Sequence, residues 1–137
     1  MLALLMFSQC AKDPIRGCLD PKSTNYCSSC DTDDGSCMYE GYVVFYPNQA
    51  AAQFLVNDGA TVLRYYINGF LVGSDVAGTY FDSEPSCTTT DATTATIFMT
   101  GTSAVANIRV IDQTDFEYFT STQTIYANDC NVIPIFR

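Results

Sequence analysis

Apolar and polar residues alternate along most of residues 41–137, in short runs separated by turn-forming residues. Such runs, rich in Val, Ile, Tyr, Phe and Thr, are typical of half-buried β-strands. We expect strands at residues 42–46, 61–67, 70–74, 94–99, 105–112, 115–126 and 132–136. The pattern predicts an all-β fold, a small β-sandwich of six to eight short strands.

A hairpin is the clearest local prediction, because Asn68-Gly69 separates two apolar runs. Asn-Gly supplies the two positive φ angles of a type I′ turn. With a two-residue loop, the expected cross-strand pairs are Ile67 with Phe70, Tyr65 with Val72, Leu63 with Ser74, and Arg64 with Gly73. The face that carries Leu63, Tyr65 and Ile67 should point into the core.

The later strands also differ in the face or edge that they expose. Alternation in 94–99 and 105–112 predicts core-facing side chains, namely Ala95, Ile97, Met99, Ala106, Ile108 and Val110. Residues 115–126 alternate polar and aromatic side chains, as expected of an exposed edge strand, and Pro134 confines the last strand to an edge. Residues 50–56 predict either a helical turn or a loop, and no helix longer than two turns is expected.

The first ten residues consist of an apolar run, 1–7, followed by Ser8, Gln9 and Cys10. A short apolar run that ends at a cysteine resembles a bacterial lipoprotein signal peptide, in which the cysteine becomes acylated. The resemblance implies that residues 1–10 comprise the signal peptide and the acylation site at Cys10. It also implies a lipid anchor at the bacterial outer membrane or cell surface. The alternative is the start of an ordinary buried strand or helix.

Setting Cys10 aside leaves six of the seven cysteines, an even number suited to disulfides in an oxidising compartment. They are Cys18, Cys27, Cys30, Cys37, Cys87 and Cys130. We expect Cys87 to pair with Cys130, joining the loop after the hairpin to the start of the last strand. Among the other four, one solution is an outer pair, Cys18 with Cys37, and an inner pair, Cys27 with Cys30. The other solution exchanges partners between these two pairs. Zinc is a rival explanation, but only one Cys-x2-Cys is present, where a zinc ribbon has two.

Three blocks frame residues 11–40: Gly17-Cys18-Leu19-Asp20-Pro21, then Asn25-Tyr26, then Asp33-Asp34-Gly35-Ser36-Cys37. In this order they resemble a short module of Bacteroidetes-type surface proteins. The resemblance implies a cysteine-framed stalk over 11–40, followed by a separate β domain over 41–137. The hairpin sequence Tyr-x-Ile-Asn-Gly-Phe-Leu-Val-Gly resembles PEGA-like surface β domains, which implies a surface domain without known catalysis.

Charge and composition exclude several function classes. The net charge is −9 without a basic cluster, which opposes nucleic-acid binding. Histidine is absent, so the usual general base and the commonest metal ligand are missing. We therefore predict that the protein is not an enzyme and has no catalytic residues. A small hydrolase that uses carboxylates is the remaining catalytic alternative.

Two groups of residues are candidate binding sites. Asp20, Asp31, Asp33 and Asp34 are candidate calcium ligands, although Gly35 and the missing closing glutamate do not fit an EF-hand. A solvated acidic turn is the favoured interpretation, and no cofactor is expected. The second group is Phe116, Tyr118 and Tyr126, predicted to share one face of a strand. These rings are candidates for binding a glycan or a protein, or else pack against a neighbouring strand.

These observations predict an envelope or cell-surface lipoprotein that acts as a binding or structural module. Its partners would be the membrane, through the lipid, and an unknown protein or glycan. An alternative is an accessory subunit of an envelope assembly, which pairs edge strands through residues 115–126.

Overall fold

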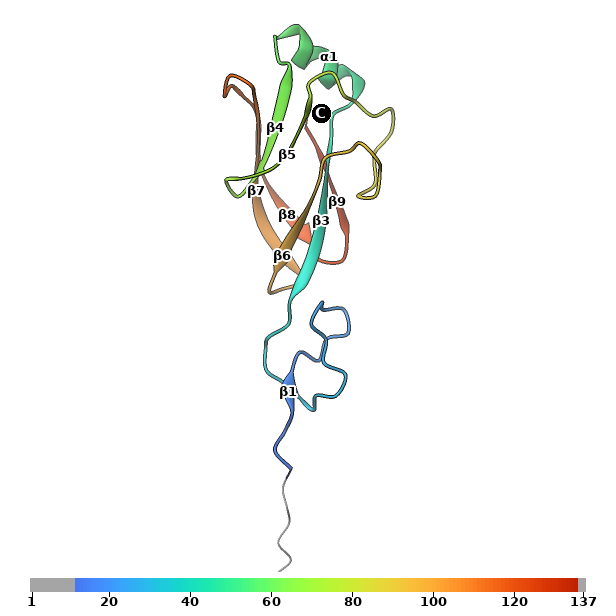
Figure 1. Cartoon of the computed structure of the whole chain (residues 1–137), viewed down its shortest axis with the longest axis vertical. Helices are drawn as coiled ribbons and strands as arrows, with labels where there is room; N and C mark the ends of the chain where they lie inside the picture. Colours follow the sequence, from blue (N-terminus) through green and yellow to red (C-terminus); the bar gives the residue numbers. More distant parts are fainter. Residues whose placement is uncertain (1–11, 136–137) are drawn as a thin grey trace, which may run out of the picture.

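The computed structural model describes residues 12–135, so the predicted signal peptide and Cys10 lie outside the described residues. The elements are β1 (Arg16–Gly17), β2 (Thr32–Asp33), β3 (Tyr39–Tyr46), α1 (Gln49–Asn57), β4 (Val62–Ile67), β5 (Phe70–Val76), β6 (Thr94–Met99), β7 (Ser103–Asp112), β8 (Glu117–Tyr126) and β9 (Cys130–Pro134). The molecule is elongated, with the cysteine-framed segment at one end and α1 at the other (Figure 1).

Two sheets pack together and confirm the predicted all-β class. One has the strand order β6-β3-β9 and the other β5-β4-β7-β8. The inward side chains of both sheets form one core, in which the rings of Phe45 and Tyr65 stack with centroids 4.5 Å apart. The predicted inward residues Leu63, Tyr65 and Ile67 are all buried in this core.

The hairpin turn is confirmed, but the predicted pairing beyond it is wrong. Asn68 and Gly69 have φ angles of 50° and 84°, as a type I′ turn requires. Ile67 pairs with Phe70 as expected, yet a β-bulge follows at Tyr65/Tyr66 and leaves Val72 as the extra residue. The observed pairs are therefore Tyr66 with Leu71, Tyr65 with Gly73, Arg64 with Ser74, and Leu63 with Asp75. A bulge places two residues of one strand opposite one of its partner, which shifts every later pair.

Helix α1 exceeds the two turns that the sequence led us to expect. Its nine residues correspond to about 2.5 turns at 3.6 residues per turn. Asn48 caps the helix, because its side-chain oxygen accepts a hydrogen bond of 2.8 Å from the backbone N–H of Ala51. Ala51, Ala52 and Leu55 are its buried residues, so a mostly alanine face lies against the sandwich.

Strand β7 confirms the predicted inward face, and β8 and β9 confirm the predicted edges. On β7, Ala106, Ile108 and Val110 are buried while Asn107 and Arg109 are exposed. Strand β8 forms one edge of the four-stranded sheet, and β9 forms one edge of the three-stranded sheet. The predicted disulfide between Cys87 and Cys130 is present and joins the loop after β5 to the first residue of β9.

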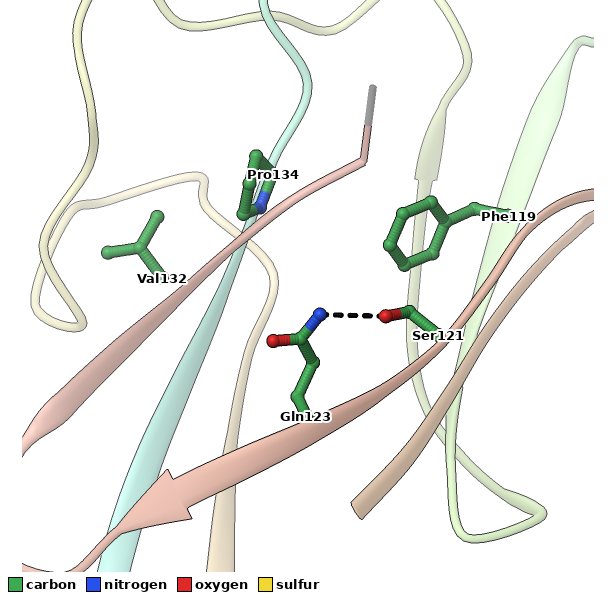
Figure 2. A pocket seen from close by; sticks show the side chains of 5 residues that line it. All are labelled: Phe119, Ser121, Gln123, Val132 and Pro134. Atoms are coloured by element: carbon green, nitrogen blue, oxygen red, sulfur yellow. Dashed lines mark hydrogen bonds between the residues drawn. The ribbon is translucent and has the colours of Figure 1, made fainter. Parts of the chain in front are cut away.

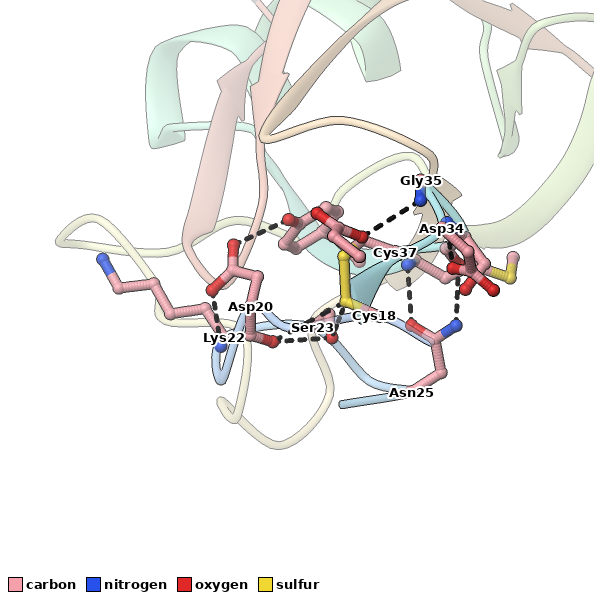
Figure 3. The surroundings of a disulfide bond; sticks show 12 residues. Cys18, Asp20, Lys22, Ser23, Asn25, Asp34, Gly35 and Cys37 are labelled. Atoms are coloured by element: carbon pink, nitrogen blue, oxygen red, sulfur yellow. Dashed lines mark hydrogen bonds between the residues drawn. A yellow bond between two sulfur atoms is a disulfide. The ribbon is translucent and has the colours of Figure 1, made fainter. Parts of the chain in front are cut away.

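The cysteine-framed segment contains the outer and inner disulfides, Cys18–Cys37 and Cys27–Cys30, and not the swapped pairing. Figure 3 shows the outer bond within a network of turns. The Asn25 side chain connects the first half of the segment to its last residues, since it accepts a hydrogen bond from the N–H of Met38 and donates one to the carbonyl of Ser36. Local hydrogen bonds and disulfides replace the large apolar core that so short a segment lacks.

This segment is joined to the sandwich by direct contacts. The Tyr39 hydroxyl donates to Asp20 Oδ2 at 2.7 Å, and Asn128 Nδ2 donates to the carbonyl of Lys22 at 3.1 Å. Strand β3 already begins at Tyr39, so it crosses the boundary that the sequence suggested at residues 40 and 41. Among residues 12–135, no helix has the length and apolar character needed to cross a bilayer.

Candidate functional site

Three aromatic rings lie together at the end of the sandwich that carries α1. We call Phe54, Phe116 and Tyr118 the distal aromatic cluster. The Tyr118 ring meets Phe116 edge-on, with centroids 4.9 Å apart, and meets Phe54 at 6.4 Å with an interplanar angle of 89°. Phe54 and Phe116 are 54% and 57% exposed, so much of their apolar surface faces solvent. Exposed aromatic groups of this kind mark interaction surfaces more often than isolated apolar residues do.

A buried carboxylate shapes the turn that presents Phe116. Asp112 is 4% exposed, and its Oδ1 accepts hydrogen bonds from the backbone N–H groups of Thr114 and Phe116 and from the Thr114 hydroxyl. Burial by itself would raise the pKa of Asp112, but these hydrogen bonds outweigh it and the pKa is lowered. The carboxylate therefore stays charged and holds the turn around Phe116.

Two side chains connect this turn to the rest of the sandwich. Arg64 Nη2 donates to Asp115 Oδ1 at 2.7 Å and also to the Asp112 carbonyl. Gln113 donates to the Gly59 carbonyl at 3.0 Å and accepts from the N–H of Thr61 at 2.9 Å. The turn before β8 is thus fixed against the loop between α1 and β4, which places Phe116 beside the helix.

A carboxylate lies beside the cluster. The Tyr118 hydroxyl donates a hydrogen bond of 2.8 Å to Asp58 Oδ2, and Asp58 is the C-cap residue of α1. Burial, reinforced by this hydrogen bond and by the Asp58 charge, raises the pKa of Tyr118 to about 12. The phenol is therefore a neutral donor across the physiological range, and it fixes the ring between the two phenylalanines.

The Asp58→Asn variant should lower the pKa of Tyr118, because it removes the negative charge that opposes phenolate formation. The pKa should stay above the usual value near 10, since burial is the largest cause of the shift. The measurement is an alkaline titration of tyrosinate absorbance, with Tyr118→Phe identifying the contribution of this ring. An unchanged Tyr118 titration in D58N would show that the two groups are not coupled.

The structure brings together only two of the three aromatic residues proposed from the sequence. Phe116 and Tyr118 are in contact, but Tyr126 lies at the opposite end of β8. At about 3.3 Å per residue, eight residues separate Tyr118 and Tyr126 by roughly 26 Å. The shared face predicted for these residues is also wrong, because a β-bulge leaves Tyr118 as the extra residue between the paired residues Glu117 and Phe119, so Tyr118 packs against the core while Tyr126 is exposed. Tyr126 is not part of the site.

The four acidic residues considered as calcium ligands are used separately. Each carboxylate accepts a nearby hydrogen bond from backbone N–H: Asp20 from Lys22, Asp31 from Ile15, Asp33 from Gly35, and Asp34 from Ser36. The hydrogen bond from Tyr39 is the main cause of a lowered pKa at Asp20, and bonds from Ser36 lower the pKa of Asp34. Over residues 12–135, no three His, Cys, Asp or Glu side chains are grouped as a metal site.

Sequence reasoning missed Phe54 and Asp58. Phe54 falls within the stretch for which helix and loop were both open, and no motif of the sequence singles out Asp58. A usable signal was present, since Asn48 precedes an alanine-rich run and is a favoured N-cap. Recognising the helix would have placed Phe54 and Asp58 one turn apart.

Comparisons with family models, with curated proteins and with solved structures find no match to this chain. The chemistry of the distal aromatic cluster must therefore be argued from its own residues. Aromatic faces bind the apolar faces of sugars or of protein side chains, while a carboxylate such as Asp58 accepts hydrogen bonds. This combination is suited to recognition.

Proposed function

We propose that this chain is a lipid-anchored protein of the bacterial envelope or cell surface, and that it works as a non-catalytic binding module. The distal aromatic cluster is its contact surface. The observation that carries the proposal is the position of α1, which contains Phe54, at the end of the molecule opposite the cysteine-framed segment (Figure 1), with the Phe54 ring in contact with Tyr118. A lipid at Cys10 would tether one end to the membrane and leave the cluster at the other end.

Three further features support this proposal. The disulfides and the contacts of Tyr39 and Asn128 support a stiff connection between the anchored end and the sandwich. A net charge of −9 favours solubility and a hydrated surface outside the cell. The cluster has apolar faces beside the Asp58 carboxylate, which suits a protein or glycan ligand with hydrogen-bond donors.

Site-directed photocrosslinking on intact cells tests the proposed contact surface. A photoreactive phenylalanine analogue placed at Phe116 should yield a discrete crosslinked product. The matched control carries the same analogue at Phe98, which is 66% exposed on β6 and lies outside the cluster. Equal crosslinking from the two positions, or none from position 116, would contradict a binding role for the cluster.

A second candidate function is that of an accessory subunit in an envelope assembly. The observation that favours it is the position of β8 as a ten-residue strand at the edge of its sheet. Exposed edges of this length readily pair with strands of other chains. A stoichiometric partner recovered with the native protein, and lost when β8 cannot pair, would support this function.

A further inference from the structure

The two lateral seams of the sandwich, where the edges of the two sheets meet, differ. At the β5/β6 seam, Thr93 lies directly against Gly73: a Cβ atom on Gly73 would be only 2.5 Å from Thr93 Cγ2. The Thr93 hydroxyl also donates a hydrogen bond to Asp75 Oδ2. Strand β5 is bulged and carries a charged residue here, both of which discourage pairing with another chain. This seam is closed.

The β8/β9 seam contains a hollow of about 400 Å³ (Figure 2). Its lining consists of Phe119, Ser121 and Gln123 from β8 and Val132 and Pro134 from β9. Within residues 12–135 the lining surface is mainly apolar and carries no charged group, and Gln123 Nε2 donates to Ser121 Oγ at 2.7 Å. Apolar side chains would therefore be favoured as its contents.

Asn131 closes one end of this seam. Its Nδ2 donates to the carbonyls of Tyr126 and Tyr42, and its Oδ1 accepts from the N–H of Tyr126. These bonds also reveal the orientation of β8. Both backbone groups of Tyr126 are bound by Asn131, a residue of β9 and not of β7, so they point away from the β7 ladder.

Because of this orientation, β8 presents a free edge of backbone N–H and C=O groups on the side away from β7. The β7–β8 register is regular from Tyr126 to Phe119, and backbone groups alternate in direction along an antiparallel strand. Thr120, Thr122 and Thr124 therefore direct their N–H and C=O groups away from β7. Within residues 12–135 no hydrogen bond to these backbone groups is found. From 118 to 126, β8 contains neither charge nor proline, the usual protections of an edge.

We propose that the β8/β9 seam accepts an extended segment of another polypeptide, which adds to β8 as a further strand. This inference rests on the second of the two proposed functions and specifies the partner. Only an extended polypeptide backbone supplies donors and acceptors at the two-residue repeat of the edge, about 6.8 Å. Alternate side chains of the segment would enter the hollow beside Phe119 and Val132, so they should be apolar.

The net charge of the protein favours a segment of a different polypeptide over a second copy of this chain as the partner. Two copies would each bring a net charge of −9 to the interface, and their long-range repulsion opposes self-association. A neutral or basic segment meets no such repulsion. The three residues of β8 with outward backbone groups, Thr120, Thr122 and Thr124, can pair with a segment of about five to seven residues. The occupant is thus a short, uncharged or basic strand with apolar residues at alternate positions.

A synthetic probe tests the proposal directly. The probe is a nine-residue peptide that alternates valine and threonine between terminal lysines, with both ends blocked. Hydrogen exchange followed by NMR should show slower exchange, by at least about tenfold, for the amides of Thr120, Thr122 and Thr124 at saturating probe. A control peptide with proline at its central position should give no such protection.

Variants at Thr122 separate backbone pairing from side-chain contacts. Thr122→Pro removes the outward N–H, which an edge strand tolerates, together with the hydrogen bond from the Thr122 hydroxyl to Asn107 Oδ1, and should weaken probe binding at least about tenfold. Thr122→Val loses the same side-chain bond but keeps the N–H, and should bind within about twofold of the wild type. If the proline variant does not fold, the amide protection in the wild type still decides the matter.

Three outcomes would overturn the inference: no protection of these amides at 1 mM probe (roughly the weakest specific affinity of interest), protection centred elsewhere, or self-association through β8 in the absence of probe. The assembly function has a separate readout. If Thr122→Pro abolishes a native stoichiometric complex while the probe does not bind, the assembly role stands and the proposed strand chemistry is wrong.

Discussion

Replacing Cys87 and Cys130 together by serine should lower the free energy of unfolding by about 4 kcal/mol. The bond joins residues 43 apart in sequence, so it removes a large loop-closure entropy from the unfolded chain. It also holds the loop after β5 against the start of β9. Denaturant titration of the oxidised wild type and of the double variant measures the difference.

The inner disulfide provides a matched control. Cys27 and Cys30 are only 3 residues apart, so replacing this pair by serine should cost about 2 kcal/mol in the same chain-entropy description. Equal losses from the two double variants would show that loop length does not govern the stabilisation. A smaller loss for Cys87 and Cys130 than for the inner pair would contradict the role given to the long-range bond.

Tyr65→Ala should destabilise the sandwich by about 3–5 kcal/mol, the usual cost of deleting a large buried aromatic ring. Tyr65 is 0% exposed and stacks on Phe45 at the centre of the core. Burial, with the Asp75 carboxylate nearby, raises the pKa of Tyr65 above its usual value, so the side chain is neutral. Thermal or denaturant unfolding measures the loss.

Tyr65→Phe separates the ring from its hydroxyl. Within residues 12–135 the buried Tyr65 hydroxyl makes no hydrogen bond of normal geometry, and the nearby Asp75 carboxylate is its polar neighbour, so its removal forfeits at most this poorly aligned contact. The phenylalanine variant should therefore unfold within about 1 kcal/mol of the wild type, or above it. A loss comparable to that of Tyr65→Ala would contradict the view that ring packing stabilises this position.

The sequence predicted the strands of the sandwich well, because their signals are local. Alternation identified the inward residues of β4 and β7, and Pro134 identified β9 as an edge strand. The pairing of Cys87 with Cys130 followed from their being the only cysteines of the β domain. Each of these inferences needed only the period of a strand or a count of residues.

The errors arose where contacts distant in sequence decide the structure. Asn68-Gly69 determines only the first hairpin pair, whereas the bulge accompanies the packing of Thr93 against Gly73, twenty residues later. The distal aromatic cluster joins Phe54 to Tyr118, which are far apart in the chain. No periodicity connects such residues, so neither the bulge nor the contact of Phe54 with Tyr118 could be inferred.

The acidic residues of the cysteine-framed segment illustrate a different limit. Their spacing left both calcium binding and a solvated turn open, because the same residue types serve both. In the structure each carboxylate accepts a hydrogen bond from a backbone N–H, as Asp and Asn side chains commonly do in turns. Asp33 and Asp34 lie only two residues from the N–H groups they bind, which is the signature of such turns.

The central claim is that the protein works outside the cytoplasm with its cysteines oxidised and its N-terminal end attached to lipid. Mass spectrometry of native protein from isolated envelopes, alkylated before and after reduction, tests this most directly. The account predicts acyl chains on Cys10, no alkylation before reduction, and alkylation of the six cysteines that form the three bonds afterwards. Free thiols before reduction, or an unmodified Cys10 behind an intact Met1, would contradict it.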